Sequence, residues 1–314
     1  MNIGGLFSGV GGVELGFKNA GFNVLWSNEI DSNAVKTLKS NFSHNIYHCD
    51  IASLNGSKLN DIDILVAGFP CQAFSIAGHR KGFEDSRGNV FFHIIRLLKE
   101  LNNKPNVIFL ENVKNLLSHD KGKTFKTIKS LLESIGYHIK HSILNSKEHG
   151  NTPQNRERIY IVAFRDILQY EKFTFPQEIT LNKNIHSILE KDVNNTFYYT
   201  EEKYPKYFNM LKNNMKNKNT IYQLRRIYVR ENKNNVCPAL TANMGTGGHN
   251  VPLVLDQEYK IRKLTPRECF LFQGFPKNFK LPTDMANSHL YKQAGNSVSV
   301  KVIERIAKKI KEVL

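Results

Sequence analysis

The first 164 residues alternate short apolar, β-branched runs with amphipathic stretches, and this alternation restricts the fold more than any other feature. Candidate strands lie at residues 3–7, 24–28, 46–49, 62–67, 107–110, 137–144 and 158–164, and candidate helices at residues 13–20, 32–42, 89–101 and 123–135. Strands that alternate with helices are typical of βαβ units, in which helices cover both faces of a parallel sheet. The sequence therefore predicts an α/β fold with a doubly wound parallel sheet.

The pattern changes after about residue 175, where Asn- and Lys-rich segments with little helical spacing replace the alternation. Helical spacing returns at residues 264–272 and in a closing helix at residues 298–313, whose single apolar stripe needs a surface to cover. We therefore expect a first domain at residues 1–184, a smaller, irregular lobe at residues 185–265, and a return to the first domain at residues 266–314.

The chain is strongly basic, with 44 Lys and Arg residues against 28 Asp and Glu residues, which gives a net charge of +16. This balance suits nucleic acid first and an anionic membrane surface second, although a lysine-rich composition also fits solubility alone. No stretch is long and apolar enough to span a bilayer, and no signal peptide is recognisable, so we expect a soluble cytoplasmic protein. The four cysteines lie far apart without C-x-x-C spacing, which predicts neither a metal site nor a disulfide framework.

A thiol and a carboxylate follow two of the predicted strands. Cys71 lies in the segment GFPCQAFS at residues 68–75, directly after the apolar run at residues 62–67, and Glu111 ends the next predicted strand. Ligands of α/β proteins collect at the carboxyl ends of strands, so the two side chains share a cleft if their strands are neighbours. The alternatives are a small buried hydrophobe for Cys71 and a capping or surface acid for Glu111.

The segment FSGVGG at residues 7–12 follows the first strand, where backbone N–H groups approach a cofactor most closely. It departs from the G-x-G-x-x-G pattern because Glu14 stands where the third glycine would be, and a plain tight turn is the alternative. Glu29, at the end of the second strand, is placed to bind ribose hydroxyls. Asp50, at the end of the third, can accept a hydrogen bond from an adenine amino group or cap a helix.

Arg156 and Arg158 stand two residues apart at the start of an apolar strand. Because side chains alternate along a strand, both are expected on the same side of the sheet. There they could meet a phosphate or a base carbonyl; a solvated charge run is the alternative.

Taken together and in this order, these segments resemble the bacterial DNA cytosine-5 methyltransferases of restriction-modification systems over nearly the whole chain. The matching segments are residues 7–12, 28–29, 50–51, 68–72, 111–113, 154–158, 262–274 and 295–298. The resemblance implies a Rossmann-like, S-adenosylmethionine-dependent methyltransferase sheet and a target recognition domain at residues 185–265. It also implies S-adenosylhomocysteine as product, no metal, double-stranded DNA with a short specific site, a monomer, and a cognate restriction endonuclease not necessarily in contact.

The resemblance assigns Cys71 as nucleophile, Glu111 as the acid at the cytosine ring, and Arg158 with Arg156 as contacts to the target base. Positions where the family contacts its cofactor are Phe7, Gly9, Glu29, Ile30, Asp50, Ile51, Pro70, Val90, Asn296 and Ser297. Ile30 stands where the family often has an aromatic residue. For reading the DNA sequence we expect Arg225, Arg226, Arg230, Thr241, Gly245, Gly247 and Gly248.

The expected reaction suits these residue types. Cytosine C5 is a poor nucleophile, so a thiolate must first add to C6, and an acid at N3 and donors at O2 relieve the charge that develops. The base must leave the helix to reach them. An RNA (tRNA) cytosine-5 methyltransferase of the same fold, a non-catalytic DNA-binding protein and a Cys-His hydrolase are the competing hypotheses.

Overall fold

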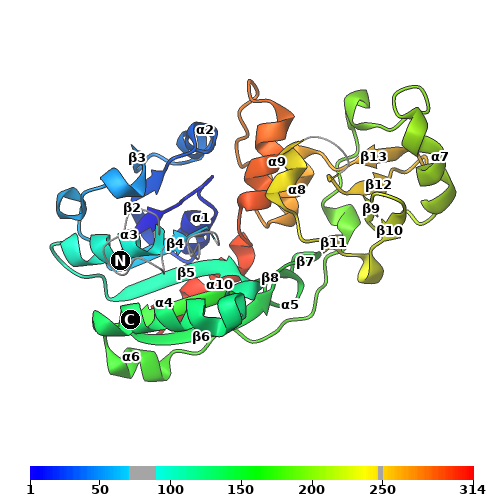
Figure 1. Ribbon diagram of the computed structural model, residues 1–314. Helices are drawn as coiled ribbons and strands as arrows, with labels where there is room; N and C mark the ends of the chain where they lie inside the picture. The colour runs from blue at the N-terminus through cyan, green and yellow to red at the C-terminus, as the bar shows by residue number, and fades with distance from the viewer. Residues whose placement is uncertain (71–89, 247–249) are drawn as a thin grey trace. The chain divides into compact units, whose positions relative to one another are not determined.

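The computed structural model describes residues 1–70, 90–246 and 250–314, which form two compact units. Unit 1 comprises Met1–Leu144, Glu157–Gln177 and Val302–Leu314, and unit 2 comprises Asn145–Arg156 and Glu178–Lys301. Figure 1 shows the seven-stranded sheet of unit 1 and the smaller sheets of unit 2. The predicted site residues Cys71, Gly247 and Gly248 lie outside the described residues.

Unit 1 is built on a sheet of seven strands, counted over the described residues, in the order β3-β2-β1-β4-β5-β8-β6. The strands are β1 (Asn2–Leu6), β2 (Asn23–Glu29), β3 (Asn45–His48), β4 (Ile64–Gly68), β5 (Val107–Val113), β6 (His138–Asn145) and β8 (Glu157–Phe164). The first five pair in parallel, as predicted.

The prediction of a wholly parallel sheet is wrong at β8, which runs antiparallel to β5. Only residues 146–156 connect β6 to β8, and they contain the four-residue helix α5 (Ser146–His149) and the two-residue strand β7 (Gln154–Asn155). A parallel crossover needs a dozen or more residues and usually a full helix, so this connection is too short for one.

Helices cover both faces of the sheet, which confirms the doubly wound arrangement. They are α1 (Gly12–Asn19), α2 (Ser32–Asn41), α3 (Val90–Glu100), α4 (Lys123–Ser134), α6 (Ile167–Lys172) and α10 (Val300–Lys311). On one face, α3 and α4 bury apolar side chains against Leu65 of β4 and Leu110 of β5. On the other, the ring of Phe17 in α1 packs edge-on against Phe109 of β5, with 5.2 Å between the ring centroids.

The closing helix α10 belongs to unit 1 from Val302 onward. Its apolar stripe, Val302, Ile306 and Ile310, is fully buried, and Lys311 donates a hydrogen bond to the Ala20 carbonyl at the end of α1. Complete burial of each such side chain contributes ~1.5–3 kcal/mol, which explains why the amphipathic pattern returns at the end of the chain.

Unit 2 contains an antiparallel sheet in the order β10-β9-β12-β13. Its strands are β9 (Tyr222–Leu224), β10 (Val229–Glu231), β12 (Leu253–Leu255) and β13 (Ile261–Lys263). A separate parallel pair is formed by β7 and β11 (Cys237–Pro238). The helices of unit 2 are α7 (Pro205–Asn214), α8 (Pro266–Phe272) and α9 (Asn287–Asn296). The expectation of little helix in this part is wrong at α7. Pro205 occupies its first turn, where no N–H is needed, and Leu211 anchors it in the core of the small sheet.

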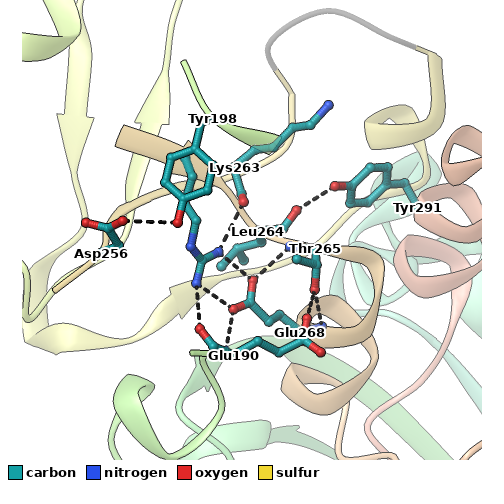
Figure 2. Close-up of polar contacts among 9 residues, drawn as sticks. Glu190, Tyr198, Asp256, Lys263, Leu264, Thr265, Glu268 and Tyr291 are labelled. Carbon is teal, nitrogen blue, oxygen red and sulfur yellow. Dashed lines mark hydrogen bonds and ion pairs between the residues drawn. The ribbon is translucent and has the colours of Figure 1, made fainter. Parts of the chain in front are cut away.

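A cluster of polar side chains, which we call the neck cluster, joins Glu190, which is exposed, to the buried residues Arg262, Thr265 and Glu268 (Figure 2). Arg262 and Glu268 form an ion pair with an N–O distance of 2.7 Å and are almost completely buried. Glu268 also accepts from the Glu190 amide at 2.8 Å, and the Thr265 hydroxyl donates to the Glu190 carboxylate at 2.5 Å. The cluster therefore holds together the two ends of residues 191–261.

Within the described ranges, none of the helices combines the length and the hydropathy needed to cross a membrane.

Candidate active site

The strands that precede Cys71 and carry Glu111 are neighbours, as the sequence interpretation required. β4 and β5 pair in parallel with Gly68 opposite Glu111, and the Asn112 side chain donates a 3.0 Å hydrogen bond to the Phe69 carbonyl. The two strands therefore end side by side at the carboxyl edge of the sheet. The hydrogen bond from Asn112 fixes the backbone two residues before Cys71.

Glu111 is paired with Arg158. Arg158 lies in β8 opposite Val113, and its Nε stands 3.2 Å from Glu111 Oε1, with 14% and 9% of the two side chains exposed. Arg158 also donates through Nη1 to the Glu157 carbonyl at 2.8 Å. A charge-assisted contact at this low exposure holds both side chains in one orientation, and so it presents an acid and a cation at the edge where the Cys71 segment begins.

Arg156 and Arg158 have different partners, Arg156 in unit 2 and Arg158 at Glu111 in unit 1. Arg156 occupies the break between β7 and β8, and side chains alternate only inside a continuous strand. It is 2% exposed in unit 2, where it donates to the carbonyls of Leu240 at 2.6 Å, Gly295 at 3.3 Å and Ser297.

The loop after β1 is anchored to the carboxylate of Glu29. The carboxylate accepts from the Gly9 amide at 2.7 Å and from the amides of Ile30 and Asp31 at 2.9 and 2.8 Å. A side chain at Gly9 would meet nothing within 4 Å, so open space lies before the loop. Phe7 adopts a φ of 54°, a left-handed conformation that costs ~1–3 kcal/mol for a non-glycine residue and is typical of functional loops.

The neighbouring strand ends complete this candidate cofactor site. Ile30 is 60% exposed, and Asp50 is exposed and caps the short helix at Ile51–Ser53 through a 2.8 Å bond from the Ala52 amide. The cap considered for Asp50 is thus observed. Asn28, which the sequence motif included without a role, donates to the Tyr47 carbonyl at 3.1 Å and the Cys49 carbonyl at 2.9 Å, and so positions the Asp50 segment.

The remaining predicted cofactor residues differ in exposure. Ile51 is buried in the core, Val90 is half-buried at the start of α3, and Pro70 is exposed. Asn296 and Ser297 belong to unit 2, at the end of α9. In unit 1, an exposed aliphatic side chain beside a buried acid and an open glycine loop fits the flat adenine and the ribose of S-adenosylmethionine.

Glu14 is a buried acid that the sequence interpretation noted only as a departure from the glycine pattern. Its Oε1 lies 3.4 Å from the Ser27 hydroxyl, which in turn lies 2.7 Å from His44 Nε2. A Cβ atom at Gly5 would come within 2.0 Å of the same oxygen, so Glu14 packs directly on β1. Burial raises the pKa of Glu14 to about 7 and lowers the pKa of His44 to about 4.

The predicted DNA-reading residues lie in unit 2. Arg225, Arg226 and Arg230 are exposed around the turn between β9 and β10. Arg225 and Arg230 line a cavity of about 450 Å³ that Lys147 also lines, and Arg225 Nη2 donates to Gln223 Oε1 at 3.1 Å.

The other two described DNA-reading candidates, Thr241 and Gly245, lie in the segment after β11. Thr241 is exposed. At Gly245, a Cβ atom would come within 2.4 Å of the Ser288 carbonyl in α9, so close packing against this helix is one reason for the glycine.

A sheet whose first loop is glycine-rich and is tied to an acid at the end of β2 defines an α/β protein that binds a nucleoside-containing cofactor. The chain belongs to the family of C-5 cytosine-specific DNA methylases, which matches residues 1–312. It is accordingly a DNA (cytosine-5-)-methyltransferase, and the family implies the use of S-adenosylmethionine.

Relatives match over almost the full length. The chain is 55% identical over 314 residues to the type II methyltransferase M.Bsp6I of Bacillus sp. (strain RFL6), covering 99% of this chain and 98% of the relative. It is 37% identical to the type II methyltransferase M.HhaI of Haemophilus parahaemolyticus, covering 96% and 91%. The fold matches the solved structure of the Entamoeba histolytica methyltransferase EhMeth with a TM-score of 0.78 at 21% identity, covering 99% and 98%.

We expect Glu29→Ala to weaken S-adenosylmethionine binding by about 1–3 kcal/mol, because it removes the partner of a ribose hydroxyl and releases the Gly9 amide. Isothermal titration calorimetry in the absence of DNA measures the effect. Asp31→Asn, which keeps an acceptor at the cap of α2, is the matched control and should bind normally. An unchanged dissociation constant in Glu29→Ala would place the ribose elsewhere.

We expect Glu14→Gln to remove one contribution to the pH dependence of stability. The raised pKa means that the folded protein holds this proton more tightly than the unfolded chain, so the contribution of Glu14 to wild-type stability falls as pH rises from about 4.5 to about 7. Glutamine removes a cost that approaches ~3 kcal/mol above pH 7. His44 changes stability in the opposite direction but is present in both proteins, so it largely cancels in the difference.

Urea unfolding at pH 5 and pH 8 tests this expectation. The stability difference between Glu14→Gln and wild type should grow in favour of the variant at pH 8. Glu133→Gln, at a half-exposed position on α4, should show no such change. A difference that is equal at both pH values would exclude a raised pKa for Glu14.

Proposed function

We propose that this enzyme flips a target cytosine out of duplex DNA and methylates it with Cys71 as nucleophile, Glu111 at N3 and Arg158 at O2. The observation that carries the proposal is the pairing of Gly68 with Glu111 across β4 and β5, together with the Glu111–Arg158 contact. It sets the acid and the cation beside the start of the segment that bears the thiol.

In this proposal the Cys71 thiolate would add to C6, and the electron pair of the C5–C6 bond would accept the methyl group that S-adenosylmethionine supplies, with S-adenosylhomocysteine as the leaving group. Loss of the C5 proton to a base then lets the C6–S bond break, which restores the ring and the thiolate. Glu111 relieves the charge that develops at N3 and Arg158 the charge at O2, and their mutual contact keeps both in place before the reaction.

S-adenosylmethionine supplies an electrophilic methyl group when bound. Glu29 would accept from its ribose, Ile30 would cover a face of the adenine, and Asp50 would accept from the adenine amino group. The loop at residues 7–9 would leave room for the rest of the cofactor. Ile51, Pro70, Val90, Asn296 and Ser297 are proposed as further contacts on the strength of the family resemblance.

Residues 185–265 are proposed to read the DNA sequence as the target recognition domain. Arg225, Arg230 and Lys147 around one cavity support this, because a concentration of cations with amide neighbours suits phosphates and base edges. Arg226, Thr241, Gly245, Gly247 and Gly248 are retained as proposed contacts. Because the substrate is DNA, we expect the enzyme to act in the bacterial cytoplasm. We also expect it to be a monomer, as the family resemblance implies.

The relatives named as type II methyltransferases favour a role in a restriction-modification system. Expression in a methylation-free host, followed by bisulfite mapping of 5-methylcytosine, would reveal the target site. DNA from that host should resist a restriction endonuclease that cuts the mapped sequence. Absence of 5-methylcytosine in DNA carrying all short sequences would refute the proposed activity.

A graft tests the recognition lobe. The neck cluster defines its boundaries, because Glu190, Arg262, Thr265 and Glu268 must stay with one parent to keep the hydrogen bonds between them. Residues 191–261 should therefore transfer specificity to a related enzyme with a different target. A graft of residues 185–265 is the matched comparison. It would bring Glu190, Arg262 and Thr265 from one parent and leave Glu268 from the other, so it should be less stable. An active graft that retains its host's target would contradict this assignment.

A further inference from the structure

Arg156 ties together three chain segments of unit 2 that are distant in sequence. Its Nη1 donates to the Leu240 carbonyl, and its Nη2 donates to the carbonyls of Gly295 and Ser297. Arg156 is 2% exposed, and these hydrogen bonds of its guanidinium all go to backbone carbonyls. A group used in this way is poorly placed to bind a base.

Glycines bring the same segments into contact. A Cβ atom at Gly295 would come within 2.1–2.2 Å of the carbonyl group of Thr241, and one at Gly245 within 2.4 Å of the Ser288 carbonyl. The loop at residues 240–246 therefore rests backbone to backbone on α9, and Arg156 fastens it where α9 ends. Arginine suits this task because its planar fork satisfies several acceptors at fixed angles.

We propose that Arg156 is a positioning residue that makes one rigid joint of the proposed DNA-reading loop and the proposed cofactor segment at residues 295–297. This rests on the proposed function, which supplies the roles of the two segments. The strand that carries Arg158, β8, begins at the next residue, Glu157. Recognition of the site and binding of the cofactor thus depend on the same arginine.

Arg156→Lys tests the proposal, because lysine keeps the charge but cannot reproduce the fork. Without DNA, its dissociation constant for S-adenosylmethionine should rise about tenfold, the effect of about one lost buried hydrogen bond. Its preference in kcat/KM for the target over a site with one mismatch should fall by a similar factor. Covalent trapping by 5-fluorocytosine DNA at saturating cofactor should persist. Methylguanidine should partly restore cofactor binding to Arg156→Ala.

Arg158→Lys is the matched control, and it should lose trapping while it binds the cofactor normally. Thermal unfolding checks that each variant is folded. If Arg156→Lys is folded and loses trapping with unchanged cofactor affinity and discrimination, Arg156 contacts the base and the proposal is wrong. Unchanged cofactor affinity, unchanged discrimination between sites and unchanged trapping in Arg156→Lys would also overturn the proposal. Wild-type methylation of DNA is measured alongside, so that failure of the proposed function is recognised separately.

Discussion

Cys71→Ala is expected to lower the rate of methyl transfer by at least on the order of 10⁴-fold while DNA binding stays largely intact. The thiolate is needed to form the bond to C6 and is not needed for docking. The surroundings that the structure describes are consistent with this role, because β4 delivers the segment beside Glu111 and Asn112 fixes the Phe69 carbonyl.

Duplex DNA with 5-fluorocytosine at the target measures the covalent step directly. Wild type should form a stable adduct and Cys71→Ala none. Burial raises the pKa of the Cys237 and Cys269 thiols well above the ordinary value, so neither is a competent substitute nucleophile. Cys269→Ala is the matched control and should retain trapping. Methylation by a folded Cys71→Ala variant would refute the assignment of the nucleophile.

The parts of the site that follow from local rules were predictable. Apolar runs identified β4 and β5, and Glu111, which ends the second run, lies near the carboxyl end of β5. The glycine loop and Glu29 followed from the same rule, because parallel strands bring all their carboxyl ends to one edge. The hydrogen bond from the Gly9 amide to Glu29 shows that the loop and the acid lie together, and cofactor binding by them stays a prediction.

Features that depend on long-range packing were not predictable. The side-chain direction of Arg156 depends on a strand break whose position is set by pairing between β7 and β11, more than 80 residues away along the chain. Glu14 looked like a missing glycine, and only its burial on β1 reveals an acid with a raised pKa. The neck cluster likewise joins Glu190 to residues more than 70 positions later, and no local pattern encodes such pairs.

Glu111→Gln is expected to lower kcat by roughly 10²–10⁴-fold, the usual contribution of a positioned acid. Glutamine preserves the shape of the side chain and an acceptor for Arg158, but it has neither the charge nor the transferable proton. Binding of S-adenosylmethionine should be unchanged, since Glu111 is not among the residues proposed to contact the cofactor. Single-turnover methylation of a synthetic duplex, after its target is known, separates the chemical step from product release.

The adjacent acid provides the control. Glu157 is 41% exposed and pairs with Lys114 at 2.5 Å, and an exposed pair of this kind contributes only ~0–1 kcal/mol. Glu157→Gln should therefore leave kcat within about threefold of wild type. If Glu111→Gln does the same, the acid at N3 must be another residue.

The pairing of Glu111 with Arg158 also predicts that substitutions of the two residues have non-additive effects on the rate. If the two act as a unit, either substitution already weakens the charge-assisted contact that orients both side chains, so Glu111→Gln combined with Arg158→Lys should cost less than the product of the single effects. A coupling energy of about 0.5–3 kcal/mol is expected for side chains in direct contact. Rate losses that multiply without coupling would mean that each group acts on the base alone, and that their 3.2 Å contact is incidental to catalysis.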